Sequence, residues 1–358
     1  MTFYVCLMLI LAFTSINNIR SKSKSFFYTF IIFALMAFKH HSIGNDTLNY
    51  IELFQRLKRM GTFIDANSRF EKGYQIYTRL IGIIFNDYQA LFIVTAFLCS
   101  LCILYGIRNY SINWQYSLFL FVGLRFFNFF LSGLRQSIAI SIIFVSYNFL
   151  RKRKYSVFLL LVLLASTFHF TAIIFVVAIP LSRWKVDFKG VIRILMSIII
   201  VYLFLTPLLN SILRYLPVYY SHYMYTDVVA SNNLANYIGT LLTFSFFIFV
   251  YFSIDKAKIN SFISSRNSET DTQLLFLLMS VGLSLIATRV SILDRMIHYF
   301  WIFSIVSIPN AIFTIKNKNR RMIWFLLITM IVIIYNIGIM IFRPEWSMII
   351  PYKFFWQK

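Results

Sequence analysis

The sequence predicts an all-α protein, a polytopic bundle of membrane helices with about 10–12 membrane segments and a long outer loop. Of its 358 residues, 59% are hydrophobic and only 13% are charged, and the mean hydropathy is +0.74. Soluble domains carry about 25% charged residues, so this composition excludes an ordinary globular core. Apolar runs long enough to cross a bilayer recur from end to end, and we therefore expect one integral membrane domain over residues 1–358.

Ten apolar runs are candidate membrane spans, and the first lacks the basic start and small-residue cleavage site of a signal peptide. The runs lie at 2–18, 25–40, 88–106, 114–131, 134–150, 190–207, 236–254, 272–288, 296–314 and 322–342. Lysines and arginines gather in the loops between them, which gives much of the formal net charge of +22. The positive-inside rule places such loops in the cytoplasm.

Whether residues 155–182 cross the membrane once or twice decides on which side the later loops lie. A single span here would put the basic run 316–321 outside, whereas two short segments that reverse near His169 keep the basic loops in the cytoplasm. At about 1.5 Å per residue the run offers roughly 42 Å of helix, which is too long for one untilted span. We therefore expect a hairpin of short helices that is buried by the rest of the protein, with one long tilted helix as the alternative.

With this parity, the outer face holds a long loop at 41–87, a second loop at 208–235, a short turn at 289–295 and the tail 343–358. The long loop has apolar residues at helical spacing and predicts an amphipathic helix on the membrane surface. Its apolar positions are Phe70, Tyr74, Tyr77, Leu80, Ile81 and Ile84. The second loop is rich in tyrosine, which suits either stacking on sugars or the aromatic belt of the interface.

Arginines and a histidine near the outer face indicate anion binding and proton transfer. Arg125 and Arg135 flank an outer turn, and a guanidinium suits bidentate capture of phosphate better than an ammonium does. The alternative is that each extends to the lipid headgroups. His169, at the expected hairpin turn, is a candidate general base, with a hydrogen-bonded core histidine as the alternative.

Acidic residues in the long loop are further candidates. Asp46, two residues after Gly44, either caps the next helix or serves as a second candidate base. Glu71 either complements a helix N-terminus or takes part in the site. At the short outer turn, Arg289 and Arg295 form another basic cluster, in which Asp294 is available for a local salt bridge.

Other chemistries find no support in the sequence. The five histidines lack metal-ligand spacing and the acids are scattered, so neither a metal ion nor a cofactor is expected. Walker, dinucleotide-binding and Gly-x-Ser-x-Gly patterns are absent from the sequence, and no nucleic-acid partner is expected. Cys99 and Cys102 have the spacing of a redox pair, but they lie in an apolar run, where packing is the expected role.

Four short motifs occur in an order that resembles the EpsG family, which comprises Wzy-like membrane proteins of exopolysaccharide, capsule and O-antigen loci. The motifs are Gly44-x-Asp46-Thr47-x-x-Tyr50, Glu71-x-Gly73-Tyr74, Leu134-Arg135-Gln136-Ser137 and Phe168-His169-x-Thr171-Ala172. Arg289 and Tyr299 match a polar element of the family more loosely.

The resemblance implies a polysaccharide polymerase that joins lipid-linked repeat units at the outer face of the cell membrane. The donor would sit on undecaprenyl pyrophosphate, and a flippase and a chain-length regulator would be further partners. In this interpretation the catalytic residues are His169, Arg135 and Asp46. The substrate-binding residues are Arg125, Gln136, Glu71, Tyr74, Arg289 and Arg295.

Two other functions stay open at this point. A flippase or transporter of lipid-linked oligosaccharide would also need arginines, but along a passage through the membrane. A membrane O-acyltransferase of polysaccharide would need an essential histidine, for which His169 is the candidate. All three hypotheses place a multi-pass protein in the inner or plasma membrane, and the polymerase has its site toward the periplasm or the cell exterior.

Overall fold

The predicted all-α fold is confirmed by the computed structural model, which describes residues 2–16, 22–213, 234–254, 268–290, 293–346 and 348–357. Within these ranges the regular structure is helical, and strand-like pairing is confined to an isolated bridge between Lys39 and Phe354. The sixteen described α-helices are α1 (Thr2–Ser15), α2 (Lys22–Ala37), α3 (Thr47–Met60), α4 (Lys72–Ile84), α5 (Gln89–Tyr110), α6 (Trp114–Gly123), α7 (Phe126–Ser132), α8 (Leu134–Arg151), α9 (Tyr155–Phe168), α10 (Ala178–Leu181), α11 (Phe188–Leu213), α13 (Leu234–Ser253), α15 (Ser268–Ala287), α16 (Asp294–Trp301), α17 (Ser304–Thr314) and α18 (Lys318–Phe342). Two 3-10 helices, η1 (Phe170–Val177) and η4 (Pro344–Trp346), complete the list.

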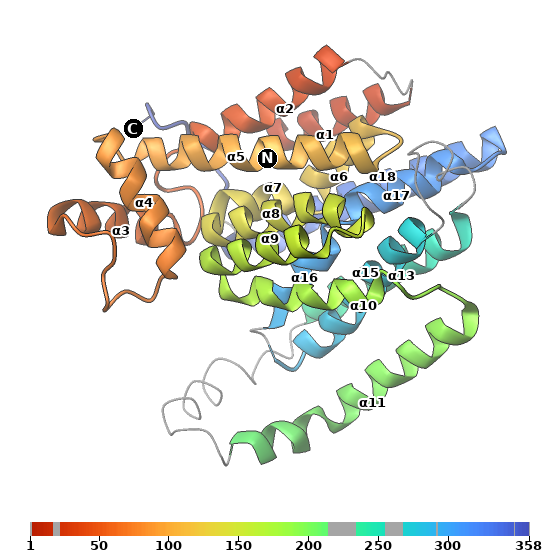
Figure 1. Cartoon of the computed structure of the whole chain (residues 1–358). Helices are drawn as coiled ribbons and strands as arrows, with labels where there is room; N and C mark the ends of the chain where they lie inside the picture. Colours follow the sequence, from red (N-terminus) through yellow and green to blue (C-terminus); the bar gives the residue numbers. More distant parts are fainter. Residues whose placement is uncertain are drawn as a thin grey trace.

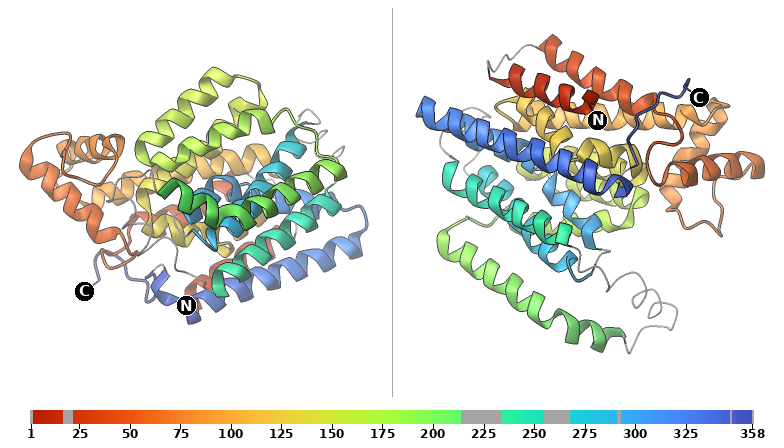
Figure 2. Two further views of the ribbon diagram at one scale, coloured as in Figure 1. Left: turned by 90° about the horizontal axis from the view of Figure 1, so that it is seen from below. Right: turned by 180° about the vertical axis from the view of Figure 1, so that it is seen from behind.

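Most of the long helices run side by side and form a bundle (Figure 1). The pair α3 and α4 extends from one end of this bundle in both views of Figure 2, and α11 lies on its outside. The chain from the last turn of α18 returns to the end where α3 begins, because backbone bonds join His40 to Lys353 and Phe355 to Phe38. The predicted outer tail therefore packs beside the start of the predicted long outer loop.

Fewer helices reach membrane-spanning length than the sequence suggests. Five of the described helices, α5, α11, α13, α15 and α18, are long and apolar enough to cross a membrane, and α16 with α17, bent by 41°, makes a sixth. The helices α1, α2 and α9 and the return arm η1–α10 are apolar but shorter. The sequence analysis predicted about 10–12 membrane segments partly because it treated each apolar run as one continuous helix. The run at 114–131 is instead divided into α6 and α7, and the run at 296–314 into α16 and α17.

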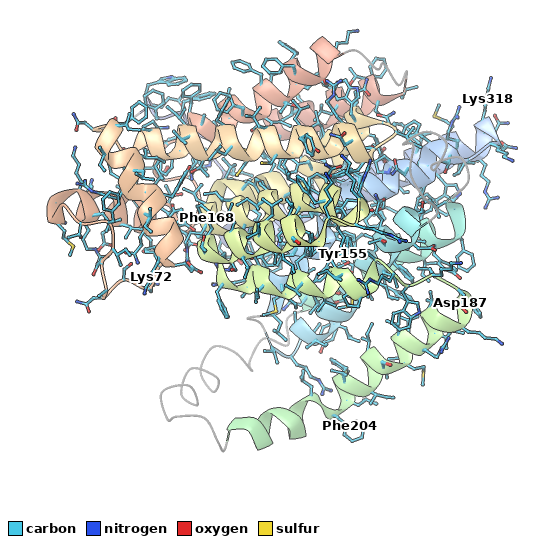
Figure 3. The ribbon with its side chains drawn as sticks, in the orientation of Figure 1. Lys72, Tyr155, Phe168, Asp187, Phe204 and Lys318 are labelled. Atoms are coloured by element: carbon cyan, nitrogen blue, oxygen red, sulfur yellow. The ribbon has the colours of Figure 1, made fainter. Side chains whose placement is uncertain are left out.

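The hairpin at 155–182 is confirmed. Helix α9 ends at Phe168, His169 is extended with φ −152° and ψ 111°, and the chain returns as η1 and α10. In Figure 3, Tyr155 and Asp187 lie toward one end of the bundle, whereas Phe168 lies toward the other, beside Lys72 at the start of α4. The turn of the hairpin therefore meets the α3–α4 pair.

Helix α4 is where the pattern placed it, but its inner face contacts protein rather than the membrane surface. Phe70, Tyr74 and Ile81 are buried, and Tyr74 packs against Tyr50 of α3 with ring centroids 5.5 Å apart. Leu80 and other outward positions remain exposed. The expectation of one apolar face laid on lipid is thus wrong for the inner half of the helix, because α3 and α9 cover it.

The second predicted outer loop, 208–235, falls mostly outside the described residues, since the structure does not describe 214–233. The tyrosines that were expected to stack on sugars lie in that range. Helix α11 leads into this loop and is packed loosely. Only 17% of its apolar segment Phe188–Leu205 is buried inside the protein, against 78% of Thr270–Ala287 in α15. Most of the apolar surface of α11 is therefore available to lipid.

Candidate functional site

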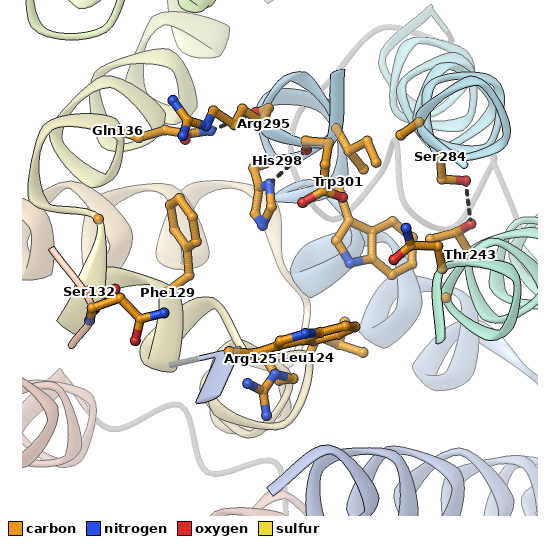
Figure 4. A pocket seen from close by; sticks show the side chains of 18 of the residues that line it. Leu124, Arg125, Phe129, Ser132, Gln136, Thr243, Ser284, Arg295, His298 and Trp301 are labelled. Carbon is orange, nitrogen blue, oxygen red and sulfur yellow. Dashed lines mark hydrogen bonds between the residues drawn. The ribbon is translucent and has the colours of Figure 1, made fainter. Parts of the chain in front are cut away.

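The two helix breaks open onto one cavity of about 650 Å³ (Figure 4). Leu124 and Arg125 line it from the first break, and Trp301 lines it from the second. Irregular backbone at membrane depth is tolerated where it borders a cavity or is buried in protein. Six of the predicted site residues line the same cavity: Asp46, Arg125, Arg135, Gln136, His169 and Arg295. This gathering of residues that are far apart in sequence makes the cavity the candidate site.

Glu71 lies behind the cavity wall and joins two of its residues. One carboxylate oxygen accepts hydrogen bonds from Nδ1 of His169 (3.0 Å) and from the backbone N–H of Phe170 (3.3 Å), and the other forms an ion pair with Arg135. Because an ionised carboxylate can only accept, Nδ1 of His169 carries the proton. Nε2 is then the acceptor nitrogen, and it has no hydrogen-bond partner among the described residues.

The charge of Glu71 is held by its two partners. Burial alone would raise the pKa of the Glu71 carboxyl, but the hydrogen bond from His169 and the nearby Arg135 guanidinium outweigh it and lower the pKa to about 2. The side chains of Arg135 and Glu71 are only 16% and 20% exposed, so the pair is little screened by solvent. At neutral pH the site therefore contains a fixed carboxylate that bridges a guanidinium and an imidazole.

Gly73 explains how Glu71 reaches the hairpin. A Cβ at this position would lie 2.4 Å from Oγ1 and 2.7 Å from the carbonyl oxygen of Thr167, so only glycine lets the first turn of α4 pack on the last turn of α9. Glu71 itself is the N-cap residue of α4 but makes no side-chain capping bond. Its carboxylate is used across the contact with α9 instead of within its own helix.

The loop before α3 is fastened to α7 in a similar way. Gly44 has φ +91°, and a Cβ there would lie 2.6 Å from the carbonyl oxygen of Leu131. The buried Lys39 ammonium donates to this carbonyl and to Oγ1 of Thr47 (2.8 Å). Asp46 occupies the N-cap position of α3 but makes no capping hydrogen bond, and its side chain lines the cavity. The capping role expected for Asp46 is therefore wrong.

Two of the lining residues have structural contacts as well. Nε2 of Gln136 donates to the backbone oxygen of Arg295 at 2.5 Å and so ties α8 to the start of α16 (Figure 4). The Arg135 guanidinium lies 4.6 Å from the centroid of Phe70 while it binds Glu71.

Arg125 adopts a left-handed backbone, φ 68°, which ends α6 and begins α7. Non-glycine residues rarely take this conformation, and they do so often at functional sites.

Two predicted site residues lie away from the cavity. The Arg289 guanidinium stacks on Tyr202, 4.0 Å from the ring centroid, and donates to its carbonyl oxygen at 2.9 Å. This contact links the end of α15 to α11. Tyr74 is fully buried between Tyr50 and Phe70. The structure brings neither Arg289 nor Tyr74 to the substrate-binding position that was expected of it.

His298 and Trp301 are cavity residues that the sequence analysis did not select. Nδ1 of His298 donates to the backbone oxygen of Asp294 (3.2 Å), and its ring stacks on Phe129 with centroids 4.4 Å apart. The available signal was their spacing, because positions 294, 298 and 301 share one helical face. Around the cavity, three arginines are accompanied by three acids, Asp46, Asp294 and Glu345, so the wall is mixed in charge rather than basic. Among the described residues, no group of His, Cys, Asp or Glu side chains is placed to hold a metal ion.

Comparison with known proteins shows the family to which the chain belongs. The sequence model of the EpsG family matches residues 23–354, a range that contains Glu71 and every residue that lines the cavity. No curated protein and no solved structure matches the chain.

Proposed function

Because the chain belongs to the EpsG family of membrane proteins linked to exopolysaccharide synthesis, we propose that it is a polymerase of lipid-linked oligosaccharide repeat units. The donor is an oligosaccharide on undecaprenyl pyrophosphate, and the acceptor is a sugar hydroxyl of the next unit. One observation carries the proposal: His169 lines the cavity, Glu71 holds its Nδ1, and its buried Nε2 has no hydrogen-bond partner among the described residues.

The proposed reaction includes one proton transfer, and His169 is the residue that accepts the proton. The acceptor hydroxyl attacks the anomeric carbon of the donor, the bond from that carbon to the pyrophosphate oxygen breaks, and the pyrophosphate leaves with the electron pair. Nε2 of His169 takes the hydroxyl proton. The Glu71 carboxylate stabilises the positive charge that the imidazole then carries, in the manner of the acid in a catalytic triad. Asp46, on the same cavity, is the second candidate base.

The pyrophosphate leaving group needs positive charge, and the arginines of the wall supply it. Arg125 and Arg295 line the cavity, and Arg135 retains guanidinium N–H groups beyond the one bound to Glu71. A guanidinium is suited to phosphate because its donors form a planar fork. Since Asp46 and Asp294 also line the cavity, the anion is positioned by individual arginines rather than by a broad positive field.

A transporter of lipid-linked oligosaccharide is the second candidate, and the two broken helices favour it. Secondary transporters often bind substrate where discontinuous helices meet, and α6–α7 and α16–α17 both break at the cavity. A transporter moves its substrate unchanged, whereas a polymerase lengthens it. The two functions are therefore separated by the product.

The test uses purified protein in liposomes with the lipid-linked oligosaccharide that accumulates in cells lacking this protein. A ladder of products spaced by one repeat unit is the expected result. Movement of the lipid across the liposome membrane with no ladder would overturn the polymerase and support the transporter.

The outer location of the cavity is tested by labelling. Asn67 and Lys152 are both exposed. Asn67 precedes α4, whose first turn packs on the last turn of α9, whereas Lys152 precedes the first turn of α9, so the two residues should lie on opposite sides of the membrane. In a background with Cys6 replaced, Asn67→Cys should react with an impermeant maleimide added to whole cells, and Lys152→Cys should react only after lysis. The reverse pattern would place the cavity on the cytoplasmic side.

A further inference from the structure

The cavity has an ionic part and an uncharged part. Its charged residues come from the loop before α3, the α6–α7 break, α8, the hairpin turn, the start of α16 and η4. By contrast, α13 and α15 contribute only uncharged side chains to the wall: Asn236, Gly239, Thr240, Leu242, Thr243, Ser284 and Ala287. In Figure 4, Thr243 and Ser284 lie across the cavity from Gln136 and Ser132, with Trp301 beside them.

We propose that this uncharged part, with Trp301 as its platform, is a saccharide subsite that holds one sugar ring of the lipid-linked oligosaccharide. The inference rests on the proposed polymerase function and adds where the sugar binds. The ionic part would then hold the pyrophosphate, so that the bond to be broken lies between the two parts. A volume of about 650 Å³ falls within the range of small-molecule sites.

Trp301 is largely buried, with 8% of its surface exposed, and it lines the cavity. It ends α16 at the bend before α17, and its ring is fixed by Phe246, with centroids 6.2 Å apart. No described residue accepts a hydrogen bond from its indole N–H. An aromatic face packs on the C–H face of a sugar ring, and the N–H can donate to a sugar hydroxyl.

The hydroxyl groups beside Trp301 complement a neutral, hydroxyl-rich ligand. Oγ1 of Thr243 lies 3.1 Å from Oγ of Ser284 and 2.8 Å from the carbonyl oxygen of Thr240, to which it donates. Oγ1 of Thr240 likewise donates to the carbonyl oxygen of Asn236 (2.9 Å). Because these protons are used within the helices, the oxygen lone pairs remain available to accept from sugar hydroxyls.

The test compares two lipids that differ only in the sugar. Purified protein is titrated with undecaprenyl pyrophosphate and with the lipid-linked oligosaccharide that accumulates in cells lacking this protein. Wild-type protein should bind the glycosylated lipid more tightly. Trp301→Leu should reduce that preference by about ten-fold, which is the size of one aromatic contact, and leave binding of the bare lipid unchanged. Trp301→Phe should restore most of the preference.

Trp324→Leu is the matched control, because Trp324 packs on Phe249 of α13 (4.8 Å between centroids) and does not line the cavity. It should change neither affinity. Should Trp301→Leu fail to fold, the double variant Thr243→Val with Ser284→Ala decides, and it should lower the preference several-fold. Equal loss for both lipids, or an unchanged preference, would overturn the subsite.

The wild-type protein separates this inference from the function on which it rests. Binding of both lipids with equal affinity, together with a product ladder, would overturn the subsite and leave the polymerase intact. Binding of neither lipid would overturn both.

Discussion

His169 and His298 line the same cavity but are held by different groups. Nδ1 of His169 meets the Glu71 carboxylate at 3.0 Å, whereas Nδ1 of His298 meets a backbone carbonyl at 3.2 Å. Both contacts fix the ring, but only the carboxylate carries a charge that stabilises a protonated imidazole. The His298 ring is also stacked on Phe129. In the proposed mechanism this difference gives the proton-transfer role to His169, whose Nδ1 contacts a carboxylate, and leaves His298 a role in shaping the cavity.

Removal of the acidic partner should have the largest effect. Glu71→Gln keeps the size of the side chain but loses the charge that holds both His169 and Arg135. We expect polymerisation to fall by at least the general-base contribution of about 10²–10⁴-fold. The free energy of unfolding should fall by about 3 kcal/mol, because a largely buried guanidinium loses its partner. Ladder formation and thermal unfolding in detergent are the measurements.

Glu52→Gln is the matched control for that change. Glu52 pairs with Arg56 one helical turn away on the surface of α3, at 3.5 Å, and is 67% exposed. Such pairs contribute little, so neither polymerisation nor stability should change. Equal losses in the two variants would show that the effect of Glu71→Gln is not specific to the cavity.

His169→Gln should lower turnover by about 10²–10⁴-fold and leave the affinity for lipid nearly unchanged. Glutamine keeps a hydrogen-bonding group but cannot take up a proton near neutral pH. Single-turnover rates and lipid titration measure the two effects separately. A variant with normal turnover would remove His169 from the mechanism and make Asp46 the leading candidate base.

Acidification should test the Glu71 contacts directly. The pKa of Glu71 falls from 4.5 to about 2 on folding, so the stabilisation is complete above pH 4.5, fades as the pH falls from 4.5 to 2, and is absent below. A shift of this size corresponds to about 3 kcal/mol. The difference in stability between wild type and Glu71→Gln should be constant from neutral pH to about pH 5 and shrink below it. A difference that disappears between pH 7 and 6 would assign the effect to another group.

His298→Gln should have the smallest effect. The backbone contact is a neutral hydrogen bond, which contributes about 1 kcal/mol, so turnover should stay within about five-fold of wild type. The assay is the same single-turnover measurement. A loss as large as that of His169→Gln would reverse the comparison and make His298 the base.

Much of the framework could be predicted from the sequence because it depends on local patterns. Hydropathy predicted the helical fold, and the charge parity of the loops predicted the hairpin that turns at His169. Arg125, Arg135 and Gln136, which the sequence analysis grouped beside one turn, line the same cavity. The helices and the turn were predicted from residues close together in the chain, whereas the hairpin also required the charges of loops as distant as 316–321.

The rest depends on contacts that no local pattern contains. Glu71 is 64 residues from Arg135 and 98 from His169, so a role within its own helix was the nearest explanation for an acid before α4. The close approach of Gly73 to Thr167 decides otherwise. His298 and Trp301 were not selected because 296–314 was treated as one continuous span, in which a histidine and an aromatic resemble ordinary packing. Both residues lie in α16, before its 41° bend to α17, and both line the cavity.

The position of the hairpin turn also bears on how the protein is made. Glu71 is synthesised well before Arg135 and His169, so its carboxylate has neither of these partners until α8 and α9 have been made, although α4 can already pack on α3. The chain up to the end of α10 contains all three residues of the cluster, whereas α13, α15 and α16, which close the opposite wall, emerge later. Since chains fold progressively from the N-terminus during synthesis, the cluster of Glu71, Arg135 and His169 is assembled first, and the later helices add Asp294 and Arg295 to the cavity wall.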